Sequence, residues 1–277
     1  MSTSKLQIST LVSPNTVHTG VLQPIGSKSF IKKLIPAAIA TILNRRTNFD
    51  DTTYTNHQLC GVKYSMFNHN NRNSTVIDIR CWIKGALHAF EKNYLRELYL
   101  VFMKADNSTD VIESYKFKFN YFLEGEKTPI TRDRLEQATT SLLQSINDLN
   151  VYDLLQTDQF APVIMLTYNK ETPNEYEPPF HHTESVTASK ILNQISGGVN
   201  SFVYLGHILT GFHSMKCRVK GSHLVPIDSE SNYTSDVDDR IDEVDRDQHT
   251  TDNKMKVEET FSTETTSDGV LLLFTTK

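Results

Sequence analysis

The hydrophobic period of this chain changes abruptly from that of a helix to that of a strand near residue 95. Between Ile77 and Tyr94, apolar side chains recur every three or four positions, which predicts a well-buried helix. The nearly continuous apolar run from Glu97 to Met103 follows at once and is typical of an inner strand. Aromatic and polar side chains then alternate from Tyr115 to Tyr121, which predicts a half-buried strand. We expect the two strands to form an antiparallel hairpin, because turn residues separate them.

Two further helices and three further strands are predicted around this centre. One helix is expected to begin at Ser27, with Ser27 or Ser29 as its N-cap, and Pro36 should kink it or confine it to its later part. The other helix should follow Thr131 and run from Arg132 to about Leu155. The further strands are expected at residues 161–168, 202–208 and 213–219.

Two long segments show little hydrophobic period. Residues 46–75 are rich in Asn, Thr and Asp, and we interpret them as a connection with short strands around 62–67. Residues 171–200 contain three prolines, two histidines and a Gly-Gly pair. A thirty-residue connection of this kind inside a compact domain indicates either a functional segment or a wrong assignment. Because the order of elements lacks βαβ alternation, we predict the α+β fold class, with a largely antiparallel sheet packed against three helices.

The charge of the chain divides it into a body and a tail. Residues 228–277 carry 14 acidic and 5 basic side chains, whereas residues 1–227 carry 19 acidic and 23 basic ones. The tail also has too few apolar residues to offset the entropy of ordering it. We therefore predict a flexible N-terminal arm over residues 1–25, one globular body over 26–227 and a disordered acidic tail over 228–277.

Composition argues against several classes of protein. No run of 18 apolar residues occurs, so we do not expect a membrane span, and the N-terminus lacks the apolar region of a secretory signal. The three widely spaced cysteines, Cys60, Cys81 and Cys217, favour buried thiols over a disulfide framework or a four-cysteine zinc module. The small positive charge of the body does not predict strong direct binding to nucleic acid.

The sequence offers no clear catalytic, cofactor-binding or metal-binding set. Phosphate-loop, dinucleotide, zinc-protease and nucleophile-elbow motifs do not occur. Adjacent residues on an extended segment point to opposite sides, so we interpret the most metal-like group as polar loop residues. That group consists of His181, His182 and Glu184, with His207 and His213 downstream.

Two other groups also have a structural interpretation. Cys217 lies in a predicted strand between two basic residues whose side chains would point away from it, which favours a buried structural thiol. The basic residues of the first helix are expected to form a solvated face; they are Lys28, Lys32, Lys33, Arg45 and Arg46. An enzyme that uses Cys217 or the histidine group stays open as an alternative.

Five stretches match one known family in their amino-acid sequence and in their order along the chain. They are SKSFIKKLIPAAIATILNRRTNF, DIRCWIKGALHAFEKNYLRELYLVF, ESYKFKFNYF, TYNKETPNEYEPPF and LGHILTGFHSMKCRVKG. Together they span about residues 20–225, and the set resembles the HORMA domain family. Three motifs are similar to those of its meiotic chromosome-axis branch. They are the E-x-Y-x-F-x-F-x-Y strand, T-P-x-x-Y-x-P-P and F-H-S-[LM]-K. The combination of body and tail is most similar to the short nematode axis proteins. Pro36 and the Asn44–Thr47 region depart from the family pattern.

The resemblance implies a non-enzymatic adaptor that holds a peptide, called a closure motif, beneath a wrapping segment called the safety belt. The belt would cover about residues 171–220, and the peptide would add a strand to an exposed sheet edge. The third helix and the belt would line the groove. Candidate contacts are Leu142, Ile146, Tyr176, Tyr204, Leu205, His207 and Phe212.

The tail carries a candidate closure motif of its own at about residues 260–277; a last strand that docks on the sheet of its own body is the alternative interpretation. An exposed apolar run in such a polar segment is hard to explain as solvent-facing chain. Its residues include Asp268, Gly269, Val270, Leu271, Leu273 and Phe274. A linker of about forty residues lets this motif reach the groove of its own body or that of a neighbour.

The resemblance also implies a setting. The protein would be in the nucleus on meiotic chromosomes, supporting homologue pairing, synapsis and crossover regulation. Its partners would be closure-motif peptides of other axis HORMA proteins and of itself, with self-assembly, and an ATP-driven remodeller; no cofactor and no membrane are implied. A checkpoint- or repair-type HORMA adaptor is the first alternative, and a cysteine- or histidine-dependent enzyme is the second.

Overall fold

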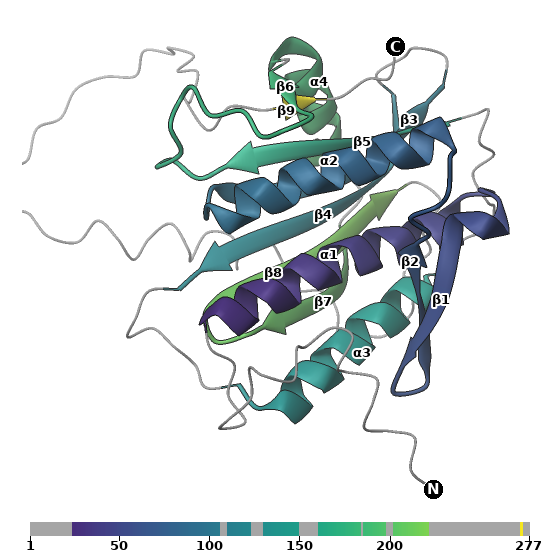
Figure 1. Ribbon diagram of the computed structural model, residues 1–277. Coiled ribbons are helices and arrows are strands. Elements are labelled where there is room, and N and C mark those ends of the chain that lie inside the picture. The colour runs from purple at the N-terminus through teal and green to yellow at the C-terminus, as the bar shows by residue number, and fades with distance from the viewer. Residues whose placement is uncertain are drawn as a thin grey trace, which may run out of the picture.

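A seven-stranded antiparallel sheet forms the middle layer of the protein (Figure 1). The computed structural model describes residues 24–105, 110–122, 130–149, 160–183, 185–197, 202–221 and 272–273. The strand order is β6-β9-β5-β3-β4-β8-β7. These strands are β3 (Leu95–Lys104), β4 (Val111–Tyr121), β5 (Phe160–Tyr168), β6 (His182–Thr183), β7 (Val203–Leu209), β8 (His213–Gly221) and β9 (Leu272–Leu273).

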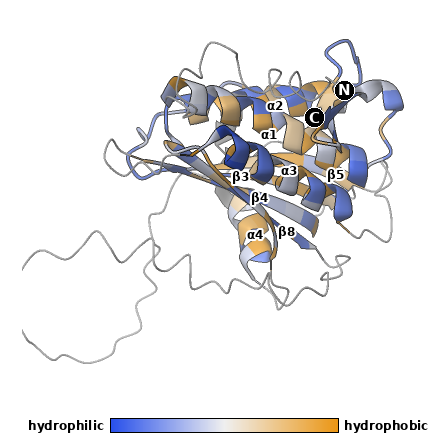
Figure 2. Cartoon of the chain, turned by 90° about the horizontal axis from the view of Figure 1, so that it is seen from below, coloured by the Kyte–Doolittle hydropathy of each residue, from blue (hydrophilic) through white to orange (hydrophobic). Residues whose placement is uncertain are grey.

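Helices cover both faces of this sheet. On one face lie α1 (Pro24–Arg46), α2 (Ser74–Glu91) and α3 (Arg132–Asp148), and on the other lies α4 (Ser185–Ser196) (Figure 2). A separate hairpin, β1 (Tyr54–Leu59) and β2 (Val62–Phe67), packs against α1, and its second strand also contacts α3. The predicted α+β fold class is confirmed.

The apolar run in β3 follows from this layering. Alternate residues of a strand point to opposite faces. Leu98, Leu100 and Phe102 belong to the main core beneath α1, α2 and α3. Tyr99, Val101 and Met103 pack instead against α4 on the other face. Both faces of β3 are therefore buried. The predicted hairpin with β4 is confirmed, with Leu100 opposite Tyr115.

The first helix differs from the prediction in its start and its continuity. It begins at Pro24, inside the stretch that was expected to be a flexible arm, and it runs through Pro36 to Arg46. Ser27 is therefore not an N-cap but a fully buried residue of the helix. Apolar packing along α1 stabilises the helix despite the hydrogen bond that proline removes. Among the described residues, no helix is both long and apolar enough to cross a membrane.

Arg46 was expected on a solvated face, and that expectation is wrong. Its side chain is only 1% exposed, and its guanidinium donates to both carboxylate oxygens of Glu113 on β4, over 2.8 and 2.6 Å. Arg45 donates to the carbonyl of Asn147 on α3, and Lys32 pairs with Glu91 on α2. The basic residues of α1 with described partners thus fix the helix to its neighbours.

The two segments without a period contain more regular structure than predicted. Residues 46–75 contain the β1–β2 hairpin, of which only the second strand was expected. Residues 171–200 include α4, which was not predicted. Helix α3 ends at Asp148, short of the predicted Leu155, and Thr131 caps its start through a side-chain bond to the Arg134 amide. Cys60 lies exposed in the β1–β2 turn, so the prediction of buried thiols is wrong for this residue.

A buried polar network joins the start of α1 to the β7–β8 turn. The Ser27 hydroxyl lies 2.6 Å from Nδ1 of His213 and also contacts the Thr210 hydroxyl. The rings of Phe90 and Tyr121 pack against the imidazole, which is 5% exposed. Burial, followed by the charge of Lys28, lowers the pKa of His213 to about 4. The imidazole is therefore neutral at physiological pH.

This buried histidine predicts acid lability. An unfolded chain binds a proton at His213 with a pKa near 6.5, whereas the folded chain resists it down to about pH 4. Stability is therefore lost as the pH falls through that window. His213 alone should lower the free energy of unfolding by about 2 kcal/mol between pH 7 and 4.5. Urea unfolding at a series of pH values measures this loss.

The variant His213→Asn is the matched control, because an amide keeps a hydrogen-bonding group near Ser27 and does not titrate. Its stability should depend less steeply on pH than that of the native chain over the same interval. Identical pH dependence in the two proteins would show that His213 is not held neutral by the fold.

Candidate peptide-binding site

The strand β9 lies between β5 and β6, at one edge of the sheet. Leu272 is paired with Leu166 of β5 and with Thr183 of β6, and Leu273 is paired with His182. The residue pairs are antiparallel on both sides. A short strand from the sequence tail therefore pairs with the outer edge of β5 at Leu166, where unpaired backbone hydrogen-bonding groups would otherwise be exposed. Of the predicted closure motif, Asp268 to Leu271 and Phe274 lie outside the described residues.

The chain that follows β5 first packs on the face that carries α2. The ring of Tyr176 contacts the rings of Tyr94 and Tyr168 at centroid distances of 4.8 and 5.7 Å. It also stacks on His88 of α2, and its hydroxyl lies 2.8 Å from Nδ1 of that histidine. Burial raises the pKa of Tyr176 to about 12, so its hydroxyl keeps its proton at neutral pH. This aromatic cluster attaches the segment to α2.

A second close contact follows at Gly85 of α2. A Cβ atom built on Gly85 would lie 2.3 Å from both the Pro179 carbonyl oxygen and Nδ1 of His181. The backbone at Phe180 has a φ of +64°, and its side chain is 52% exposed. Only glycine lets the segment come this near to the helix. The extended strand β6 begins directly afterwards.

Helix α4 then packs on the opposite face of the sheet. Its buried Ala188, Ile191 and Ile195 join the cluster formed by the outer residues of β3 and β5. Lys220 of β8 donates to the carbonyl oxygens of Ile195 and Gly197 over 2.8 and 2.7 Å. A cation at this end of a helix is favourable because the helix dipole is negative there. The Val111 amide donates to the side-chain oxygen of Gln194, which attaches α4 to β4 at a second point.

Residues 169–197 thus pass from one face of the sheet to the other around the edge where β9 lies (Figures 1 and 2). We call the described part of this stretch the wrapping segment. It contacts α2 before the edge, pairs with β9 at the edge through β6, and covers β3 and β5 beyond it. A strand held at this edge is therefore enclosed on its outer side.

Most of the predicted groove residues lie elsewhere. Leu142 and Ile146 of α3 are buried in the main core, and the Leu142 side chain approaches Gly206 of β7. Tyr204, Leu205 and His207 belong to β7, at the far end of the sheet from β9, and Phe212 lies in the turn that follows. Tyr176 is the one member of the predicted set in the wrapping segment. The structure therefore does not bring the set together at the edge that β9 occupies.

The Cys217 thiol and the Ser27–His213 pair, which could take part in catalysis by their chemistry, are both buried. Cys217 is fully buried in β8, and burial raises the pKa of its thiol. Ser27 and His213 are close enough for proton exchange, but both are buried. Within the described stretches, no three His, Cys, Asp or Glu side chains are arranged to hold a metal ion.

The fold thus combines an antiparallel sheet, helices on both of its faces and a wrapping segment that passes around the edge where β9 lies. The family model described as "HORMA domain" matches residues 27–213. This chain belongs to the HORMA domain family.

Relatives of known sequence agree with this assignment. The chain is 28% identical to HORMA domain-containing protein 2 of Bos taurus over 207 residues, which cover 68% of this chain and 65% of the bovine protein. It is 24% identical to the Mus musculus protein of the same name over 258 residues, covering 85% of this chain and 81% of that protein. The match with the bovine protein thus spans less than two thirds of that protein's length.

Solved structures show the same fold. Caenorhabditis elegans HTP-1 bound to the HIM-3 closure motif superposes with a TM-score of 0.65 at 16% identity, covering 79% of this chain and 98% of that one. The C. elegans HTP-2 structure with the same motif gives a TM-score of 0.61 at 15% identity, covering 76% of this chain and 96% of that one.

Proposed function

We propose that this protein is a peptide-capturing adaptor that binds an extended strand at the outer edge of β5. The observation that carries the proposal is the position of β9, which is paired with β5 on one side and with β6 of the wrapping segment on the other. Addition of a strand supplies affinity through backbone hydrogen bonds, and side-chain contacts supply selectivity. The wrapping segment corresponds to the first part of the proposed safety belt.

Release of a strand held in this way requires the wrapping segment to detach. It is fixed to α2 by the Tyr176 cluster and to the opposite face by α4 and Lys220. Local unfolding of these contacts must precede dissociation, so affinity resides mainly in a slow off-rate. An ATP-driven remodeller is the partner that we propose for opening it.

The natural ligands proposed here are closure motifs. HTP-1 and HTP-2 of C. elegans were solved with HIM-3 closure motifs bound, which supports the same mode of binding for this chain. Its own motif, at about residues 260–277, is proposed to occupy the site in cis or to bind a neighbouring copy. We propose a body that ends near residue 227 and an acidic tail that connects it to the motif.

The biological role proposed is that of a non-enzymatic adaptor of the meiotic chromosome axis, acting in the nucleus in pairing, synapsis and crossover regulation. Its similarity to HORMA domain-containing protein 2 and the closure-motif complexes of its structural relatives support this role. Recovery of spindle or polymerase subunits alone in a pull-down would favour the checkpoint or repair alternative instead.

Substitution of Gly85 by alanine tests whether the wrapping segment holds the ligand. Alanine in a helix is normally stabilising by about 1 kcal/mol relative to glycine. Here the new methyl group would clash with the Pro179 backbone and with His181. We expect the wrapping segment to be displaced, so that a bound closure-motif peptide dissociates about tenfold faster. Stopped-flow or surface-plasmon measurement of the off-rate provides the test.

Lys84→Ala is the matched control, because Lys84 is an exposed residue of the same helix. Its off-rate should equal that of the native chain. An unchanged off-rate in Gly85→Ala, with helix α2 folded normally, would contradict a role of this crossing in ligand retention.

A further inference from the structure

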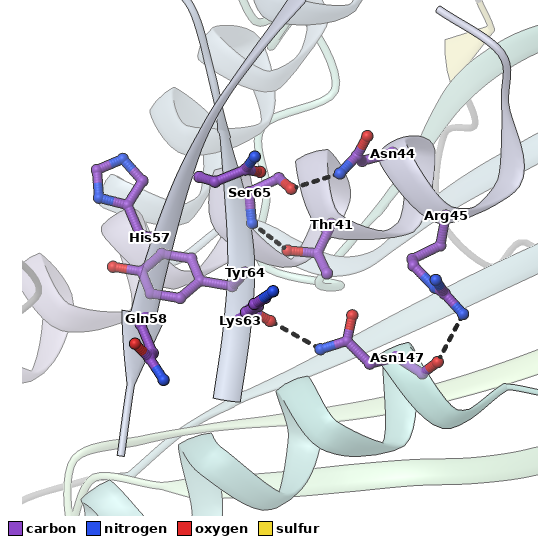
Figure 3. A pocket seen from close by; sticks show the side chains of 10 residues that line it. Thr41, Asn44, Arg45, His57, Gln58, Lys63, Tyr64, Ser65 and Asn147 are labelled. Carbon is purple, nitrogen blue, oxygen red and sulfur yellow. Dashed lines mark hydrogen bonds between the residues drawn. The ribbon is translucent and has the colours of Figure 1, made fainter. Parts of the chain in front are cut away.

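A polar cavity lies on a different part of the molecule, between the end of α1, the β1–β2 hairpin and the end of α3 (Figure 3). Its volume is about 480 Å³, within the range of about 300–1,000 Å³ that is typical of ligand sites. Its ten lining residues are Thr41, Asn44, Arg45, Asn56, His57, Gln58, Lys63, Tyr64, Ser65 and Asn147. None of them belongs to the wrapping segment or to the strands that pair with β9.

Hydrogen bonds between the three elements hold the walls of this cavity in place (Figure 3). Thr41 of α1 accepts from the Ser65 amide, and the Asn44 side chain donates to the Ser65 hydroxyl. Across the cavity, the Asn147 amide group donates to the Lys63 carbonyl, while Arg45 donates to the carbonyl of Asn147. The site is therefore largely formed before any ligand arrives, which lowers the entropic cost of binding.

The charge of the lining is positive. It contains Arg45 and Lys63 and no carboxylate. Neither cation has a carboxylate partner among the described residues. Asp148 neighbours the site in sequence, but both of its carboxylate oxygens accept from Gln144 of the same helix. An anionic ligand would therefore meet two available cations.

We propose that this cavity binds an acidic stretch of polypeptide. Arg45 and Lys63 would pair with Asp or Glu carboxylates, because charge-assisted hydrogen bonds are the strongest that such side chains form. The carboxamides of Asn44, Asn56 and Gln58 suit the peptide backbone, since each offers both a donor and an acceptor. A bare anion would use the cations and leave these amides without a role.

The chain itself contains a segment of this chemistry. Residues 228–247 hold nine acidic and two basic side chains. They belong to the stretch that connects β8, which ends at Gly221, to β9, which begins at Leu272. Residues 228–247 of the same chain are therefore the proposed occupant, and capture of an acidic segment of another molecule is an outcome that the experiment distinguishes.

The test uses a full-length chain, called the tail-neutral chain, in which the nine acidic residues of 228–247 are replaced by their amides, so that no tail of its own competes. Binding of a fluorescent peptide of the native residues 228–247 is measured by anisotropy. In the tail-neutral chain, Arg45→Gln/Lys63→Gln should weaken this binding about tenfold. Lys84→Gln/Lys92→Gln changes the net charge equally at two exposed residues and should change it by no more than about twofold. A peptide with all nine acidic residues replaced by amides should not bind.

The native full-length chain then tests occupation in cis. Tighter binding of the labelled peptide to the tail-neutral chain than to the native chain would show that the native tail occupies the cavity. Equal binding to these two chains would overturn the assignment to the chain's own tail. Equal binding to the tail-neutral chain with and without Arg45→Gln/Lys63→Gln, or binding of the neutral peptide, would overturn the cavity as an acidic-peptide site. The probe lacks the closure motif, so this result is independent of capture at β5.

Discussion

Replacement of Arg46 by alanine is expected to reduce the free energy of unfolding by about 3–5 kcal/mol. The substitution leaves the Glu113 carboxylate, which is 1% exposed, without the guanidinium that donates to both of its oxygens. An uncompensated charge in this position is costly, because burial removes the water that would otherwise solvate it. Urea unfolding followed by circular dichroism measures the loss.

The double variant Arg46→Met/Glu113→Leu distinguishes the loss of a partner from the loss of the pair. Removal of both charges leaves neither group unpaired, so much of the stability should return. The Tyr115 hydroxyl lies beside the pair, and burial together with the Glu113 charge raises its pKa well above the usual value. A cost below about 1 kcal/mol for Arg46→Ala would show that Glu113 is not held as a buried carboxylate.

Substitution of both Leu272 and Leu273 by proline is expected to release the β5 edge. Proline has no backbone N–H, and consecutive N–H groups of a strand point to opposite edges, so the change removes a donor toward β5 and another toward β6. Amide hydrogen exchange should accelerate at least about tenfold in the part of β5 around Leu166 and in β6. Protection in β3 and β4 should not change.

A proline at Thr251 provides the control, because it lies in the tail outside the predicted motif. It should leave exchange in β5 and β6 as in the native chain. Equal protection of β5 in all three proteins would mean that the contact between β5 and β9 does not persist in solution.

The centre of the fold could be predicted because its sequence signals are local. The alternation from Tyr115 to Tyr121 depends only on which face of β4 is buried, and the apolar run of β3 requires only that both faces are covered. The polar strand β1 (YTNHQL) lies on the surface, so its sequence contains no comparable pattern of burial.

Two features were missed although the sequence carries a signal for them. Ala188, Ile191, Leu192 and Ile195 have the spacing of an amphipathic helix, but flanking prolines and a Gly-Gly pair obscured α4. Arg46 continues the buried stripe of Ile35, Ile39 and Ile42 at spacings of three and four. A charged residue in register with an apolar stripe indicates a buried partner, and Glu113 is far away in sequence.

The sequence could not predict which sheet edge pairs with the strand from the tail. Strand order is a long-range property, so no local pattern tells that β5 is next to β9 and that β7 lies at the opposite end. The groove residues Leu142, Ile146 and Leu205 were predicted from the family resemblance, and the structure places these three in the core, where α3 packs against β7.

The most direct test of peptide capture at the β5 edge measures the binding of a labelled peptide of residues 258–277 to a chain truncated before Thr260. Capture at the β5 edge predicts a one-to-one complex that dissociates slowly, and it predicts no binding by the same peptide with prolines at Leu272 and Leu273. Absence of binding to the folded truncated chain, or equal binding of the two peptides, would contradict capture by strand addition.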